Sequence, residues 1–317
     1  MRFPVAAALG GLLLAATQMA AAQVVPKYAY NAVGRPFLVR VREPKEAKHL
    51  QLELLSAPDA RVLARAPTHV GELDLAKAFP GLWKDKNPHV LYLQLAEGDR
   101  KVGPALVLQP MTSPPVSRLK ADGKTVEFVP TESQAYAGIR AWVDQDVVFD
   151  TDMGRMRFRM RPDCAPNTAW TIMHLVSDGF YRNLIWHRVV AMSHGFPFVI
   201  QGGDPAGDGN GGPGFSYPLE DSPLPHDFGV ISIARDADPN TNGCQIFVCL
   251  SREGTARLDH KYASFGQCIE GAETILKIAA VKVGKEDRPL KPPVIRWAKL
   301  VDAAPYGDGP QPVHRRS

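Results

Sequence analysis

In the first third of the chain, apolar and polar residues alternate with a period of two. Val39 and Val41, for example, flank Arg40. The same alternation is found in four segments: 37–42, 50–54, 91–95 and 105–108. A period of two sends successive side chains to opposite faces of a strand, so each segment is expected to be a half-buried strand. Since Pro and Gly separate the segments, we expect a small antiparallel β-sandwich over residues 24–110.

The length of the chain predicts a second domain. Its 317 residues exceed the usual single-domain size of about 100 to 200 residues. The region 111–138 begins with a proline-rich stretch that includes Pro114 and Pro115, which has the composition of a linker. We therefore expect a linker over 111–138, a second domain over 139–302 and a flexible tail over 303–317.

The first 22 residues have the pattern of a secretory signal peptide. Arg2 precedes an apolar run at 5–16, and Ala20 to Ala22 provide a small-residue cleavage site. The alternative is an uncleaved membrane anchor, but Gly10 and Gly11 break a run already short for a spanning helix. We expect cleavage, export to the periplasm or the medium, and a monomer without a membrane span after cleavage.

Charge, cysteine content and motif searches exclude several function classes. The 37 Lys and Arg residues are mixed among 33 Asp and Glu residues, which argues against a nucleic-acid partner. Cys244 and Cys249 are expected on one strand at an odd offset, on opposite faces, so buried free thiols are favoured over a disulfide. The sequence lacks HExxH, CxxC and GxSxG, so we predict no metal, no cofactor and no serine hydrolase.

The second domain should begin with a hairpin at Met153-Gly154, because strand-like segments flank this dipeptide. A helix should follow, with Asn167 or Thr168 as its cap and Gly179 at its end. A second helix is expected at 272–281, where apolar residues recur at helical spacing. We interpret the acidic pair at 220–221 as a solvated turn and the glycine-rich segment 202–212 as a flexible loop, since it lacks the Lys-Ser/Thr of a phosphate loop.

Three further segments carry a distinctive set of residues: Trp186–Val190, Phe198–Asp204 and Asp238–Phe247. Leu258-Asp259 and the segment from Tyr262 to Gly266 extend the set. In order, and nearly in spacing, they resemble the signature of the cyclophilin family, including its bacterial members. The resemblance covers about 139–300. It implies a mainly β fold with a closed eight-stranded barrel capped by two helices, and peptidyl-prolyl cis/trans isomerase activity on proline-containing polypeptides.

Rotation about an Xaa-Pro bond faces a barrier near 20 kcal/mol and requires no nucleophile or metal. A catalyst must hold the proline and favour the twisted bond. Arg188 is our candidate donor to the prolyl nitrogen or the adjacent carbonyl oxygen, and the resemblance implies that Gln201 binds substrate backbone and orients Arg188. It further implies the substrate-binding residues Phe198, Val199, Phe247 and Leu258 around the proline, Ala234, Arg235, Asp236 and Gln245 around the preceding residue, and Tyr262 beside them.

The sequence departs from the family pattern at two main places. An insertion at 191–195 is expected to lengthen a loop beside the groove, and Arg257 replaces an aromatic residue that usually lines the pocket, which argues against binding of cyclosporin-type inhibitors. These departures leave an alternative, a scaffold or binding module that holds proline peptides with weak catalysis. For His187 we expect a structural role as a packed, hydrogen-bonded histidine.

Overall fold

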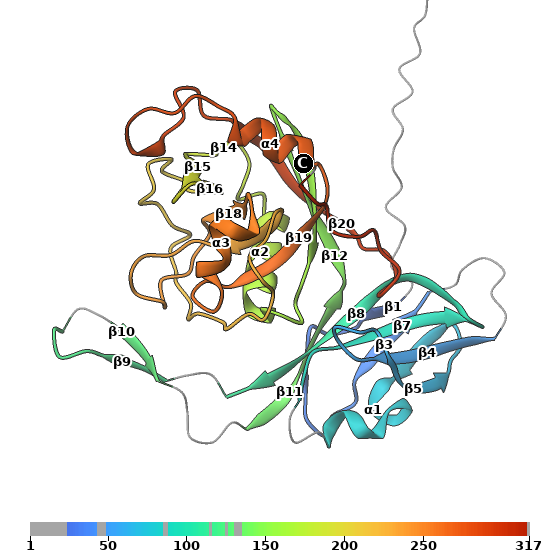
Figure 1. Cartoon of the computed structure of the whole chain (residues 1–317). Coiled ribbons are helices and arrows are strands. Elements are labelled where there is room, and N and C mark those ends of the chain that lie inside the picture. Colours follow the sequence, from blue (N-terminus) through green and yellow to red (C-terminus); the bar gives the residue numbers. More distant parts are fainter. Residues whose placement is uncertain are drawn as a thin grey trace, which may run out of the picture.

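The computed structural model describes residues 24–42, 49–84, 88–113, 116–123, 126–129 and 135–315 (Figure 1). The expected signal peptide lies outside the described residues. In the described part of the chain, the N-terminal half contains two larger antiparallel sheets and a separate two-stranded hairpin, and the C-terminal half contains one strongly curved sheet of nine strands.

The N-terminal half has the antiparallel architecture expected from its period-two pattern. One sheet contains, in order, β2 (Tyr30–Ala32), β11 (Tyr136–Val143), β8 (Arg100–Thr112), β7 (Leu91–Glu97), β4 (Leu50–Leu55) and β5 (Val62–Pro67). The other contains β1 (Val24–Pro26), β3 (Leu38–Val41) and β6 (Gly71–Asp74), and is followed by α1 (Leu75–Ala78) and the 3-10 helix η1 (Pro80–Trp83). Val39, Leu52 and Leu93 are fully buried in the core that both sheets share. Each sheet therefore buries one face against the other.

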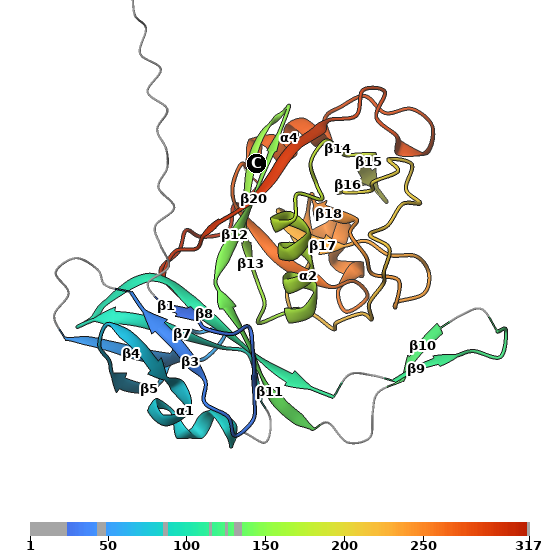
Figure 2. The ribbon, with the colours of Figure 1, turned by 180° about the vertical axis from the view of Figure 1, so that it is seen from behind.

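The join between the two halves differs from the expected linker. Strand β11 pairs with β8 and β2, so it belongs to the N-terminal sheet, and Asp144 alone separates it from β12 (Gln145–Thr151). Earlier in the expected linker, β9 (Val116–Leu119) and β10 (Val126–Val129) pair as a hairpin that projects from the body of the molecule (Figures 1 and 2). The second domain thus begins near Gln145 rather than at Ile139, because the N-terminal sheet pairs the main chain of β11.

The C-terminal sheet curls until its edges nearly meet. Its strands are, in order, β14 (Leu184–Ile185), β20 (Val294–Asp302), β12, β13 (Gly154–Met160), β19 (Ser264–Glu270), β17 (Val230–Ile233), β18 (Ile246–Cys249), β16 (Phe196–Gly202) and β15 (Arg188–Ser193). The edge strands β14 and β15 are separated only by Trp186 and His187, and three residue steps span at most about 11 Å. The sheet must therefore wrap into a barrel of eight longer strands with the two-residue β14 as a ninth, which confirms the expected fold class.

Two helices cover the barrel, as expected: α2 (Pro166–Ser177) and α4 (Ala272–Ala279) (Figure 2). Ile172 of α2 and Ile275 of α4 are fully buried in the same core as Phe149 and Trp186 of the barrel. The remaining short helices are α3 (Arg252–Thr255), η2 (Ala256–Leu258) and η3 (Lys285–Asp287). The expected hairpin at Met153-Gly154 is confirmed as the turn between β12 and β13.

Helix α2 is not capped by its own residues, contrary to expectation. Its N-cap, Ala165, provides no side-chain hydrogen bond. Instead the carboxylate of Glu220 accepts hydrogen bonds from the N–H groups of Asn167 at 2.9 Å and Thr168 at 2.7 Å, and from the Thr168 hydroxyl at 2.8 Å. A carboxylate there satisfies free N–H groups at the positive end of the helix dipole. Glu220 is therefore a distant helix cap rather than a solvated turn residue.

Replacement of Glu220 by alanine is expected to lower the free energy of unfolding by about 1–2 kcal/mol, because the first turn of α2 loses its cap. Urea denaturation followed by circular dichroism measures this change. Glu253→Ala, which removes an exposed acidic side chain in α3, is the matched control and should change stability by less than about 0.5 kcal/mol. Equal effects of the two substitutions would contradict a capping role.

The residues after β20 do not form the loose tail that their composition suggests. The ring of Tyr306 stacks on that of Tyr92 in β7 with centroids 3.5 Å apart. Further on, the N–H of Val313 donates to the carbonyl of Cys268 in β19 at 2.9 Å. The segment 303–315 therefore leaves the barrel, contacts the N-terminal domain and returns.

The four cysteines are all free and buried. Burial raises the pKa of Cys164, Cys244 and Cys268 to about 12. Their thiols therefore stay protonated at neutral pH, as the expectation of buried free thiols implied.

Candidate active site

A row of side chains crosses four neighbouring strands of the barrel. Arg188 of β15 lies opposite Gln201 of β16, and Gln201 lies opposite Phe247 of β18. Phe247 in turn lies opposite Ser232 of β17. Directly opposed residues of antiparallel strands project to the same face, whereas the alternate residue Ile200 is fully buried in the barrel core. The row therefore lies on the outer face of the barrel.

A second apolar cluster, separate from the barrel core, lies on this outer face. Its buried members are Cys164, Val190, Val199, Leu224, Val230, Phe247, Cys249 and Leu258, with Phe198, Ala234 and Tyr262 packed against them. It opens into a pocket of about 130 Å³. The pocket is lined by Arg188, Phe198, Val199, Gln201, Ala234, Arg235, Phe247, Leu258 and Tyr262. A cationic group thus stands beside an apolar hollow.

Nine of the eleven site residues predicted from the sequence line this pocket. The other two, Asp236 and Gln245, line an adjoining pocket of about 250 Å³, which shares Gln201, Ala234 and Arg235 with the first. The glycine-rich loop forms another wall of the adjoining pocket. The structure therefore brings all eleven residues together, while the role of each remains a prediction.

Arg188 begins a chain of hydrogen bonds along the pocket. Its Nη1 donates to Oε1 of Gln201 at 3.4 Å, and Nε2 of Gln201 donates to Oε1 of Gln245 at 3.1 Å. Nε2 of Gln245 then donates to the carbonyls of Gly209 at 2.9 Å and Gly211 at 3.0 Å. Because two backbone carbonyls fix the amide of Gln245, the chain orients Gln201 and, through it, Arg188.

Asp287 is a second neighbour of Arg188, and no sequence pattern predicted it. Its Oδ2 lies 3.4 Å from Nη2 of Arg188, and both side chains are 43% exposed. A guanidinium has five N–H donors, so the contacts with Gln201 and Asp287 leave donors available to a substrate.

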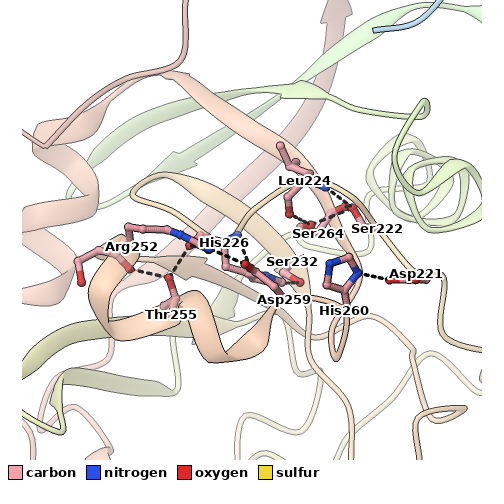
Figure 3. Close-up of polar contacts among 11 residues, drawn as sticks. Asp221, Ser222, Leu224, His226, Ser232, Arg252, Thr255, Asp259, His260 and Ser264 are labelled. Carbon is pink, nitrogen blue, oxygen red and sulfur yellow. Dashed lines mark hydrogen bonds and ion pairs between the residues drawn. The ribbon is translucent and has the colours of Figure 1, made fainter.

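A buried histidine, His226 (Figure 3), lies beside Phe247. The rings of His226 and Phe247 are nearly parallel, with centroids 5.9 Å apart. Nδ1 of His226 lies 3.0 Å from Oδ1 of Asp259, and Nε2 lies 3.1 Å from Oγ of Ser232. Because an ionised Asp259 can only accept a hydrogen bond, the ring proton of His226 is assigned to Nδ1. Nε2 therefore accepts a hydrogen bond from the Ser232 hydroxyl. Burial lowers the pKa of His226, which keeps the ring neutral at neutral pH.

Asp259 connects the segment that carries His226 with α3, which carries Arg252. It accepts a hydrogen bond from the backbone N–H of His226 at 2.8 Å and lies 2.6 Å from Nη2 of Arg252. Burial alone would raise the pKa of Asp259, but hydrogen bonds from Arg252 and His226 outweigh it and lower the pKa to about 2. The sequence placed Asp259 in the family signature without showing this role.

His187 differs from its expected hydrogen-bonded state. The residue is only 4% exposed. Within the part of the chain that the structure describes, neither ring nitrogen has a hydrogen-bond partner. Burial lowers the pKa of His187, so its role is that of a packed, neutral ring.

The insertion at 191–195 extends a hairpin instead of lengthening a loop. Strands β15 and β16 remain paired up to Ser193 opposite Phe196. The intervening His194 and Gly195 have φ angles of 51° and 84°, the left-handed conformation that a two-residue type I′ turn requires. The insertion therefore forms the end of a regular hairpin, with Ser193 as the last residue of β15.

Known proteins resemble the C-terminal half of the chain. Residues 146–300 match the family model described as "Cyclophilin type peptidyl-prolyl cis-trans isomerase/CLD". Peptidyl-prolyl cis-trans isomerase-like 1 of Emericella nidulans is 38% identical over 163 residues, which span 50% of this chain and 96% of the relative. A putative peptidyl-prolyl cis-trans isomerase of Staphylococcus saprophyticus is 32% identical over 186 residues, which span 49% of this chain and 91% of the relative.

Among solved structures, a cyclophilin type peptidyl-prolyl cis-trans isomerase of Cryptosporidium parvum, determined in the presence of the dipeptide Ala-Pro, has 31% identity and a TM-score of 0.45. The match covers 50% of this chain and 99% of the Cryptosporidium parvum chain. The family model begins at residue 146, after the N-terminal sheets, and ends within the last strand of the barrel. The fungal and staphylococcal relatives are matched over nearly their whole length at more than 30% identity. The chain therefore belongs, through its C-terminal half, to the cyclophilin type of peptidyl-prolyl cis/trans isomerases.

Proposed function

We propose that this isomerase accelerates Xaa-Pro rotation with Arg188 as the hydrogen-bond donor beside an apolar proline pocket. The supporting observation is that Arg188 lines the same pocket as Phe198 and Phe247. A proline ring in this hollow would bring its imide bond to the guanidinium. Since the donors are charged and oriented by Gln201, they favour the twisted bond, in which the prolyl nitrogen has regained its lone pair.

In this proposal the residue before the proline occupies the adjoining pocket. Asp236 and Gln245 line that pocket, and Gln201, Ala234 and Arg235 lie at its boundary with the first. The larger hollow leaves space for different side chains, whereas the smaller one suits a compact ring. The proline would then be held while the preceding part of the chain rotates.

Exchange NMR on the peptide acetyl-Ala-Ala-Pro-Phe-amide tests the isomerase function directly. We expect the protein to increase cis/trans exchange well above the uncatalysed rate, which corresponds to tens of seconds at 25 °C. A titration of the same peptide, followed by chemical shifts, measures binding. Binding without faster exchange would favour the alternative of a proline-peptide binding module.

We further propose that the substrates are exported proteins. The support is the signal-like pattern of the first 22 residues. Among the residues that the structure describes, no helix has the length and apolarity needed to cross a membrane.

The export proposal predicts a periplasmic or secreted protein that lacks its first 22 residues. Cell fractionation with compartment markers and intact-mass spectrometry check this outcome. A matched variant with Arg in place of Leu13 and Leu14 interrupts the apolar run and should keep the protein in the cytoplasm. A cytoplasmic wild-type protein of unprocessed mass would contradict the proposal.

A further inference from the structure

Arg257 stands at the rim of the proline pocket, in η2. Its guanidinium carbon lies 4.1 Å from the ring centroid of Phe198, one of the pocket walls. Its Nη2 donates to Oγ of Ser193 at 3.1 Å. The extended hairpin and the replaced aromatic residue are therefore physically connected: the hairpin brings Ser193 to the position where it holds Arg257 against Phe198.

The contacts of the guanidinium groups distinguish Arg257 from the other two arginines at the pocket, Arg188 and Arg235. Arg188 is paired with Asp287 at 3.4 Å. Arg235 lies over the ring of Tyr262 at 4.5 Å, and its guanidinium donates to the backbone carbonyls of Lys261, Asp236 and Ala237.

Within the described residues, Arg257 makes no ion pair, although its side chain is exposed to solvent. A guanidinium stacked on an aromatic ring and held by one hydroxyl keeps most of its donors free. Such a fixed, planar fork matches the geometry of a carboxylate. Because stacking and the Ser193 hydrogen bond have already restricted the side chain, pairing with a carboxylate costs less conformational entropy than it would for a mobile arginine.

The position of Arg257 defines which part of a substrate it would meet. The residues predicted to bind the amino acid before the proline are at the end of the groove shared with the glycine-rich loop, and Asp236 and Gln245 belong to that end. Arg257 lies instead over Phe198, which lines the proline pocket but not the adjoining one. A chain that crosses the groove would therefore pass Arg257 after its proline.

We infer that Arg257 makes the groove select polypeptides with an acidic side chain in the two positions after the proline. This inference rests on the proposed function, because it uses the same pocket and the same direction of the bound chain. It adds a substrate class: polypeptides with an acidic segment after a proline. The apolar pocket alone would not distinguish these polypeptides from others that contain proline.

The test compares the amidated peptides acetyl-Ala-Ala-Pro-Glu-Glu-amide and acetyl-Ala-Ala-Pro-Gln-Gln-amide by exchange NMR at low ionic strength. We expect kcat/KM of the full chain to be about two- to fivefold higher for the Glu peptide, the range of an exposed ion pair. The preference should fall to about one in Arg257→Gln and decrease as salt is added. Arg182→Gln, which removes an exposed arginine after α2, should retain it.

Three outcomes separate this inference from the function on which it depends. Faster exchange of both peptides with no Glu preference overturns the inference and leaves the isomerase function intact. If exchange is accelerated for neither peptide, the proposed function is overturned. The preference for Glu is then decided by the ratio of the two dissociation constants, which chemical-shift titration measures. A Glu preference unchanged in Arg257→Gln also overturns the inference. Ser193→Ala should reduce the preference partly, because Ser193 positions Arg257 without touching the substrate.

Discussion

Replacing Arg188 by alanine is expected to lower kcat/KM for an Xaa-Pro peptide by about ten- to a hundredfold. A hydrogen bond from a charged group is worth about 1.5–3 kcal/mol, which corresponds to that range of rates. If the donor acts on the twisted bond more than on the planar one, the loss appears in kcat rather than in KM. Exchange NMR at several peptide concentrations separates the two constants.

Arg182→Ala is the matched control for Arg188→Ala, since it removes an exposed arginine after α2, away from the groove. It should leave both constants unchanged. Because Arg188 is partly exposed and paired with Asp287, its loss should preserve the fold, which circular dichroism and the thermal midpoint verify. Full activity in a folded Arg188→Ala protein would show that the barrel performs its chemistry without this donor.

Replacing Asp259 by asparagine is expected to destabilise the protein at neutral pH and to flatten its acid dependence. The pKa of Asp259 is about 2 in the folded protein, against about 3.9 for an unfolded aspartate. Because folding lowers this pKa, the ionised carboxylate contributes stability above pH 4, and the contribution is lost as the pH falls towards 2. This difference corresponds to about 2.6 kcal/mol, and solvent screening of the partly exposed carboxylate reduces the expected contribution to about 2 kcal/mol at neutral pH.

Urea denaturation between pH 7 and pH 2 measures this contribution. The wild-type and Asp259→Asn curves should approach each other towards pH 2, as Asp259 becomes protonated. Asp221→Asn is the matched control. Asp221 lies 2.6 Å from Nδ1 of His260 (Figure 3), but both side chains are mostly exposed, so its curve should follow that of the wild type. Parallel curves for Asp259→Asn and the wild type would mean that another group supplies the acid dependence.

The row of side chains on the outer face of the barrel could be predicted from the sequence because local patterns mark its residues. Arg188, Gln201 and Phe247 fall in three signature segments, and these segments form the neighbouring strands β15, β16 and β18. Once the strands are paired, cross-strand neighbours necessarily share a face. The two barrel helices were equally predictable, since apolar residues at helical spacing mark them.

Other parts of the site depend on contacts between segments far apart in the chain. Glu220 caps a helix from 52 residues away, and Asp287 reaches Arg188 across 99 residues. A lone acidic residue in a loop carries no local sign of such a partner. The role of His226 was missed for the same reason. It depends on contacts with Asp259 and Phe247, which belong to two other segments of the chain.

The domain boundary was misplaced because composition describes a segment and not its pairing. The proline-rich sequence around 114–115 predicted a linker, but the chain returns after it to the N-terminal sheet as β11. Predicting this return requires knowing that β8 is the neighbouring strand of β11. The tail was misjudged similarly, since its one large aromatic residue, Tyr306, finds a stacking partner in the other domain.

The direct passage from β11 to β12 has a practical consequence for dissecting the enzyme. A fragment that starts at Ser117 would carry β11 without β8 and β2, and would expose the buried side chains of Ile139 and Ala141 together with an open strand edge. Unpaired apolar edges promote aggregation. A cut at Asp144, with the C-terminal segment to Arg315 retained, removes both N-terminal sheets and divides neither β11 nor β12.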